Sequence, residues 1–147
     1  MLVYTSGPLA DDLAAIGPVA VRLFASSSAP DTDFVARLTD VDPEGRSLNV
    51  TEGVIRARFR ENVWGAPKLI EPGRIYEYTI DLQVTAHVFR RGHRIRLQVT
   101  SSSFPVWDRN LNTGEDPATG TRMAVARQTV HHGGAYLSQL LLPVVSR

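Results

Sequence analysis

The chain has 147 residues, of which 43% are hydrophobic and 21% are charged, as is ordinary for a globular protein with a substantial core. Its net charge of +1 suits neither nucleic acid nor an anionic membrane, and no apolar run approaches the ~20 residues of a membrane helix. The lack of cysteine excludes disulfides, thiolate metal sites and a cysteine nucleophile. We therefore expect no nucleic-acid and no membrane partner.

The first twelve residues have neither the basic region nor the long apolar stretch of a signal peptide, which favours a cytoplasmic location over secretion. Strand-like Leu2-Val3-Tyr4 follows Met1 directly, as at the start of an excised domain. The one helical turn that the sequence allows lies near Leu9–Ala15. The length predicts a single domain over residues 1–147.

The first half of the chain predicts strands joined by short turns. Every second residue of 19–25 is apolar, which indicates a half-buried strand, and Phe34–Val41 alternates in the same way. Residues 42–45, Asp-Pro-Glu-Gly, predict a turn, because proline presets φ and glycine supplies a positive φ. Two further strands are expected at Ser47–Thr51 and Val54–Arg60.

The second half contains the strictest alternation. Over Tyr76–Thr85 one predicted face is apolar and consists of Tyr76, Tyr78, Ile80, Leu82 and Val84. Strands are also expected at Arg94–Thr100, Met123–Val130 and Tyr136–Val145, the last with a central apolar run at 140–142. Many short strands with Gly/Pro turns predict an all-β sandwich or jelly roll.

Four carboxylates lie close together in the sequence, at Asp31, Asp33, Asp40 and Asp42. Alternate residues of a strand point the same way, so each pair could converge on a calcium ion. However, Asp31 follows a proline, Asp42 precedes one, and no EF-hand pattern is present. We therefore interpret these carboxylates as turn residues and predict no metal.

Signals for catalysis are weak. There is no G-x-S-x-G elbow, and Ser101-Ser102-Ser103 ends a strand instead of occupying a strand-to-helix turn. The spacing gives no serine partner to the histidines at 87, 93, 131 and 132, and the last two would point to opposite faces of a strand. We predict no catalytic, cofactor-binding or metal-binding residue.

The segment 104–114 is the strongest candidate for a functional surface. It combines two aromatics, an Asp–Arg neighbour pair and two amides, which can lock a loop by side-chain hydrogen bonds or make a contact with another domain. The candidate domain-contact residues are Phe104, Trp107, Asp108, Arg109 and Asn110. An alternative from another class is a carbohydrate-binding module in which Trp64 and Trp107 stack on sugar rings.

Three motifs resemble the C-terminal domain of the CocE/NonD hydrolases, the family of cocaine esterase, the X-Pro dipeptidyl-peptidases and the α-amino acid ester hydrolases. They are SSSAPDTDFVARLTDVDPEGRSLNVTEGVIRARFR at 26–60, RGHRIRLQVTSSSFP at 91–105 and DRNLNTG at 108–114. The resemblance implies a jelly roll of the galactose-binding-like type that follows an α/β-hydrolase domain.

In that family the serine, aspartate and histidine of the catalytic triad lie in the preceding domain, and no position here matches them. The resemblance therefore implies a fragment of a larger serine hydrolase acting on esters or X-Pro peptides. Its expected role is to pack on the catalytic domain, help shape the substrate pocket and support contacts in a homo-oligomer.

Overall fold

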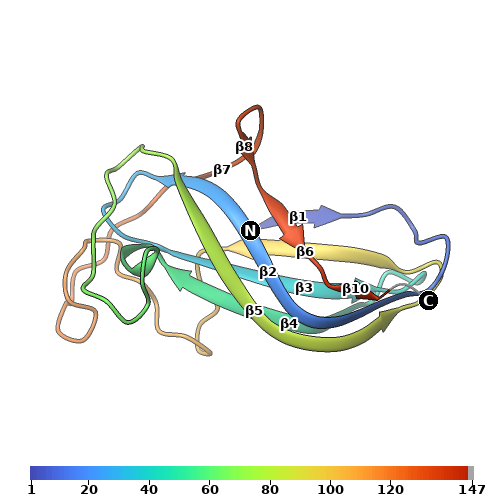
Figure 1. Cartoon of the computed structure of the whole chain (residues 1–147). Helices are drawn as coiled ribbons and strands as arrows, with labels where there is room; N and C mark the ends of the chain where they lie inside the picture. The colour runs from blue at the N-terminus through green and yellow to red at the C-terminus, as the bar shows by residue number, and fades with distance from the viewer. Residues whose placement is uncertain (146–147) are drawn as a thin grey trace.

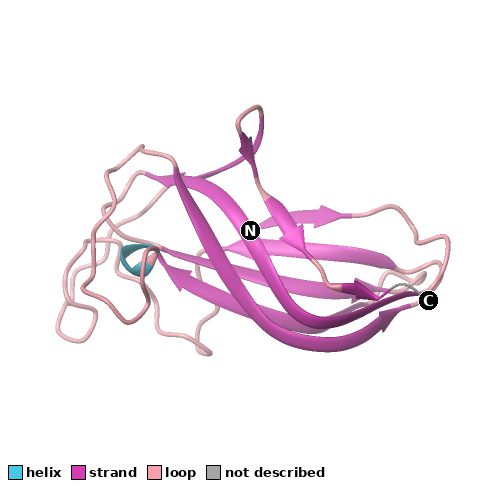
Figure 2. Ribbon diagram, viewed as in Figure 1, coloured by secondary structure: helices cyan, strands magenta, loops and turns pink. Residues whose placement is uncertain are grey.

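The computed structural model describes residues 1–145 and is a sandwich of two antiparallel sheets (Figures 1 and 2). The strands are β1 (Leu2–Thr5), β2 (Leu13–Ser27), β3 (Asp33–Val41), β4 (Ser47–Arg56), β5 (Tyr76–Phe89), β6 (Arg94–Thr100), β7 (Gln128–Gly133), β8 (Tyr136–Leu137), β9 (Gln139–Leu141) and β10 (Val144–Val145). A 3-10 turn, Ala57–Phe59, follows β4. The predicted all-β sandwich is confirmed. Among residues 1–145 no helix is long and apolar enough to cross a membrane.

One sheet has the order β1-β6-β3-β4, and the other is built around β2, which pairs with β5, β7, β9 and β10. The connection 28–32 and the two long connections 57–75 and 101–127 gather at one end of the sandwich, at the left of Figure 1. We call this the loop end. The short turns between β3 and β4 and between β5 and β6 lie at the opposite end.

The central strand β2 is much longer than the sequence predicted. Its apolar alternation is confirmed, because Val19, Val21 and Leu23 are buried against the other sheet. The helical turn near Leu9–Ala15 was wrong: Leu13 already lies in β2, opposite Phe89 of β5. Pairing with β5 outweighs the local helix propensity of this alanine-rich segment.

An extra residue in β5 reverses which side chains face the core. The register with β2 shifts between Pro18 and Ala20, and Gln83 adopts a φ of 66° while its amide donates to Asp81 Oδ1 at 2.7 Å. This is a β-bulge. Beyond it Val84 is 74% exposed, so its predicted place on the buried face was wrong. The strand continues to Phe89 instead of ending at 85.

The two sheets meet directly along β4 and β5. The Thr51 hydroxyl donates a hydrogen bond to the Leu82 carbonyl of β5. A Cβ on Gly53 would lie 1.8 Å from the Asp81 carbonyl oxygen, so only glycine allows this approach. The predicted interruption between residues 51 and 54 is absent, since β4 is continuous and ends at Arg56.

The C-terminal strands are shorter than predicted. β7 begins only at Gln128, and the expected strand over 136–145 is divided into β8, β9 and β10. Between β8 and β9, Ser138 Oγ donates to the His131 carbonyl at 2.5 Å and accepts from the Phe24 amide at 2.9 Å. The side chain thus replaces ladder hydrogen bonds. Leu141 is exposed, so the run 140–142 is not fully central.

Candidate functional site

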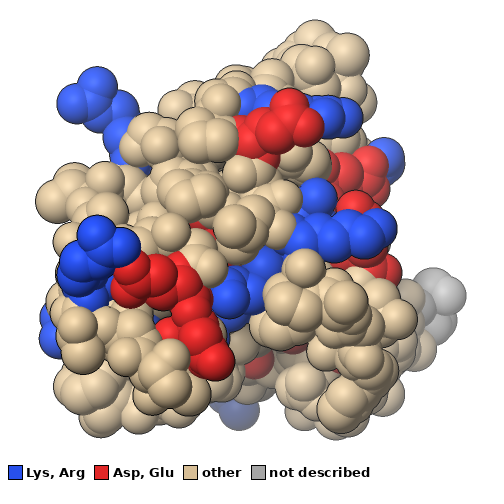
Figure 3. Space-filling view, turned by 90° about the vertical axis from the view of Figure 1, so that its left-hand side faces the viewer, with Lys and Arg blue, Asp and Glu red and all other residues tan. Residues whose placement is uncertain are grey.

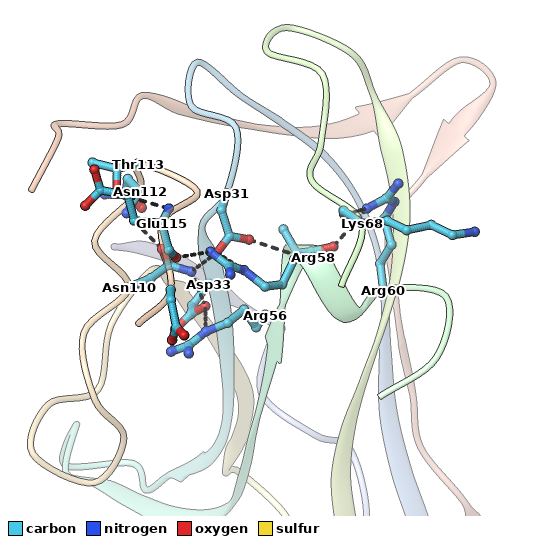
Figure 4. Close-up of polar contacts among 12 residues, drawn as sticks. Asp31, Asp33, Arg56, Arg58, Arg60, Lys68, Asn110, Asn112, Thr113 and Glu115 are labelled. Atoms are coloured by element: carbon cyan, nitrogen blue, oxygen red, sulfur yellow. Dashed lines mark hydrogen bonds and ion pairs between the residues drawn. The ribbon is translucent and has the colours of Figure 1, made fainter. Parts of the chain in front are cut away.

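Two aspartate–arginine pairs lie side by side beneath the loop end (Figure 4). Asp31 Oδ2 accepts from Arg58 Nε at 2.8 Å, and Asp31 Oδ1 accepts from the Arg58 backbone amide at 3.0 Å. Asp33 accepts two hydrogen bonds from the Arg56 guanidinium, at 2.9 and 3.1 Å. The antiparallel register brings these charges together, because Asp33 is paired with Arg56 at the ends of β3 and β4.

Asn110 joins both pairs to the long loop. Its Nδ2 donates to Asp31 Oδ2 and to Asp33 Oδ1, both at 2.8 Å (Figure 4). Arg58 Nη2 donates to the Glu115 carbonyl at 2.9 Å, which adds a second attachment. We call Asp31, Asp33, Arg56, Arg58 and Asn110 the brace. It fixes the loop 101–127 to the ends of two core strands.

The brace is largely withdrawn from solvent. The side chains of Asp31 and Arg58 are 1% and 9% exposed, so each charge depends on its partner. Hydrogen bonds to Asp33, opposed by burial, raise the pKa of Arg56 above its ordinary value. Asp108, which is exposed, adds a weaker contact to Arg56 at 3.3 Å. The brace therefore holds the loop 101–127 in place through paired, largely buried charges.

The five residues predicted as a domain contact share this loop but point in different directions. Asn110 and Asp108 face the scaffold, as part of the brace and beside Arg56. Phe104 is 65% exposed, with the Arg109 guanidinium 5.5 Å from its ring centroid, and Trp107 is half-buried. Some residues of this loop thus hold it to the scaffold, while others are exposed to solvent.

Figure 3 looks onto the loop end. Basic and acidic side chains lie next to one another there, in groups that are separated by uncharged surface, drawn in tan. No area of this face is of one charge, which agrees with the small net charge of the chain. A partner at this end would be recognised through apolar contacts and paired polar contacts, and not through a strong electrostatic field of one sign.

The turn interpretation of the carboxylates was correct for Asp42 and wrong for the other three. Partial desolvation opposes ionisation of Asp42, but hydrogen bonds from Arg46 outweigh it and lower its pKa. Asp31 and Asp33 belong to the brace. A sequence signal existed: Arg56, at the end of β4, and Arg58, in the 3-10 turn that follows, repeat the two-residue spacing of the aspartates.

Asp40 joins two histidines that the sequence left unassigned. Its carboxylate bonds His87 Nε2 at 2.9 Å and His93 Nδ1 at 2.8 Å, and its side chain is buried. The bulge in β5 makes this contact, because it turns His87 inward. Both carboxylate oxygens of Asp40 are thus hydrogen-bonded to imidazole rings. Among residues 1–145 no group of three or more potential ligands is arranged to hold a metal ion.

The structure also brings together a serine and a histidine that sequence spacing did not connect. Ser26 Oγ lies 3.3 Å from His131 Nε2. Within residues 1–145 no hydrogen bond links the His131 ring to a carboxylate, and Ser26 lies on the regular strand β2. The pair lacks the orienting acid and the exposed turn of an activated nucleophile.

An apolar groove of about 520 Å³ separates the sheets on the side away from β4 and β5. Leu23 of β2 and Leu97 of β6 are among its walls, and Tyr4 meets His132 edge to face across it at 5.8 Å. Among residues 1–145 no carboxylate lines this groove, so the lining offers mainly apolar contact.

Tyr78 lies buried beside the loop end, with its ring centroid 4.8 Å from that of Phe34. Burial raises its pKa from 10.0 to about 12. The folded state therefore keeps a proton that the unfolded chain loses above pH 10. The resulting stability is complete below pH 10 and is lost as the pH rises through 12, at about 1.4 kcal/mol per unit.

Tyr78→Phe is therefore expected to reduce the loss of stability between pH 10 and 12. At pH 7 the variant should be at least as stable as the native chain, because the Tyr78 hydroxyl has no hydrogen-bond partner among residues 1–145. Urea unfolding across this pH range measures both effects. Parallel curves for the two proteins would contradict the assignment to Tyr78.

Comparison with known proteins agrees with this geometry. Residues 1–141 match the family described as X-Pro dipeptidyl-peptidase C-terminal non-catalytic domain. All of the chain aligns at 45% identity over 149 residues with the cocaine esterase of Rhodococcus sp. (strain MB1 Bresler), and covers 26% of that enzyme.

Two solved structures share the fold at 32% identity. An aminopeptidase from the marine sediment archaeon Thaumarchaeota archaeon superposes with a TM-score of 0.89, over 99% of this chain and 26% of its own. An α-amino acid ester hydrolase superposes with a TM-score of 0.93, over 98% and 25%. The chain thus spans about a quarter of the length of these relatives.

The sandwich and these matches define the class: this is a non-catalytic β domain of the kind that forms the C-terminal part of hydrolases. The chain belongs to the X-Pro dipeptidyl-peptidase C-terminal domain family, the C-terminal domain of the CocE/NonD hydrolases.

Proposed function

We propose that this chain packs on the α/β-hydrolase catalytic domain of a longer serine hydrolase and forms part of the wall of its substrate pocket. The observation that carries the proposal is the brace. A loop of 27 residues (101–127) without secondary structure is held by buried charges while it displays Phe104 to solvent. A rigid loop with an exposed aromatic loses little entropy on contact.

Further apolar side chains are exposed at the same end. Trp64 is 93% exposed and Val125 is 98% exposed, and Val106 lies next to Phe104 in the loop. Several exposed apolar side chains at one end of a domain are typical of an interaction surface. The relatives named as esterase, aminopeptidase and ester hydrolase support an ester or peptide bond as the target of the parent enzyme.

In the complete enzyme, Phe104→Ser is expected to lower kcat/KM for p-nitrophenyl acetate about tenfold, because displacement of a pocket wall misplaces the substrate. Leu48→Ser is the matched control. Leu48 is also exposed, but it lies near the turn at the opposite end of the sandwich. It should leave kcat/KM unchanged.

Equal effects of the two substitutions would contradict the contact through the loop. Hydrolysis of the ester by the purified 147-residue chain, blocked by a serine-directed inhibitor, would overturn the non-catalytic role. The exposure of Trp64 favours glycan binding as the second candidate. A saturable change in tryptophan fluorescence with oligosaccharides, lost in Trp64→Ala, would support that candidate instead.

A further inference from the structure

The outer face of the sheet around β2 is divided into a polar and an apolar half. Before the bulge, β5 presents Glu77, Thr79 and Asp81 to solvent, and Glu77 pairs with Arg22 of β2 at 2.7 Å. Beyond the bulge, the same face of β5 presents Val84, Ala86 and Val88. The extra residue at Gln83 is the cause, since it moves the apolar positions of the strand from the core to the surface.

Neighbouring strands extend this apolar half. On β2, Ala14 is paired with Val88, Ile16 with Ala86 and Pro18 with Val84, and cross-strand partners share a face. β9 and β10 continue it with Leu141 opposite Ala20 and Val145 opposite Ala14. We call this surface the outer apolar face; its members are Ala14, Ile16, Pro18, Ala20, Val84, Ala86, Val88, Leu141 and Val145.

None of these nine side chains is charged, and the larger ones remain open to solvent. Ile16 is 56% exposed and Val84 is 74% exposed. Strands β2 and β5 run side by side along the sandwich, so the surface is continuous (Figure 1). An uncharged, continuous and solvent-exposed sheet face of this kind is a docking surface, and residues 1–145 do not cover it.

The size of the face decides between two kinds of partner. Three strands at ~4.8 Å spacing and seven residues at ~3.3 Å rise give roughly 300 Å². A stable dimer needs about 800 Å² from each copy, because two separate molecules lose translational and rotational freedom. A partner in the same chain is already held at a high effective concentration and can use a smaller surface.

We propose that the outer apolar face packs against the catalytic part of the same longer chain, specifically against the apolar stripe of one amphipathic helix. This inference rests on the proposed function. The axes of the outer two of three neighbouring strands lie ~10 Å apart, which is about the width of one helix. The matched domain is C-terminal and covers 26% of cocaine esterase, so the remaining three quarters can reach both this face and the loop end.

The test uses the complete enzyme with the photo-crosslinker p-benzoyl-L-phenylalanine at Val84. The matched control carries the crosslinker at Thr79, which is exposed on the same face of the same strand but on the polar side of the bulge. After irradiation and digestion, the Val84 probe should attach to one helical peptide of the catalytic part. Its yield should exceed that of the Thr79 probe about tenfold, because Thr79 lies outside the apolar contact.

Attachment to a second copy, equal yields from the two positions, or no attachment within the chain would overturn this inference. In those cases the proposed function stands or falls separately, on the result for Phe104→Ser. If the gene encodes no catalytic part, both proposals are wrong. The two failures are therefore distinguishable.

Discussion

Arg58→Met is expected to lower the free energy of unfolding by about 3–5 kcal/mol, because it leaves a buried carboxylate without its cation. Asp31 is 1% exposed and accepts hydrogen bonds from Arg58 Nε and from Asn110. The Glu115 carbonyl loses its donor as well. Urea unfolding followed by circular dichroism at pH 7 measures the change.

Two companion variants interpret this result. Arg58→Lys should have an intermediate effect, since an ammonium keeps the charge but cannot serve Asp31 and the Glu115 carbonyl in the same planar geometry. Arg46→Met removes an exposed guanidinium from Asp42 and should leave the midpoint unchanged. A small effect of Arg58→Met, similar to that of Arg46→Met, would show that the brace does not stabilise the fold.

Gly53→Val is expected to cost at least about 3 kcal/mol, at the upper end of overpacking effects, or to prevent folding. The added Cβ would lie 1.8 Å from the Asp81 carbonyl oxygen and 2.8 Å from its carbon. Both atoms belong to backbone, so relief requires that β4 and β5 separate. The Thr51 hydrogen bond to Leu82 would then be lost.

Gly133→Val provides the control, because a Cβ at Gly133 meets no atom within 4 Å and the residue also lies at a strand end. Thermal unfolding of the two variants should differ strongly, with the Gly133 variant close to the native chain. If both variants unfold at the native midpoint, the direct contact between β4 and β5 is not a determinant of the fold.

Much of the fold follows from alternation of apolar residues. The period of two predicted the strands at 34–41, 76–85 and 94–100, because each has a face in the core, although in 76–85 the predicted face is buried only up to Leu82. The bulge could not be predicted in this way. Gln83 is an ordinary polar residue, and its positive φ arises from the register between β2 and β5, which a single strand does not contain.

The candidate site was predictable only in part. The composition of 104–114 identified the loop, but it did not separate inward from outward residues. That separation depends on the register of β3 and β4, which places Asp33 opposite Arg56 and leaves room for Asn110 between the carboxylates. Pairing between distant segments, not local pattern, thus determines which side chain locks the loop.

The bulge has a consequence for how this domain can change in evolution. Up to Leu82 the even-numbered residues of β5 face the core, whereas after the bulge the odd-numbered residues do. Both halves therefore keep their inward-facing side chains only if Gln83 stands between them. Loss of one residue there would bury Val84, turn Phe89 to water and withdraw His87 from Asp40. β5 therefore tolerates no change in its length around Gln83, and natural insertions near it are expected in the connections between strands.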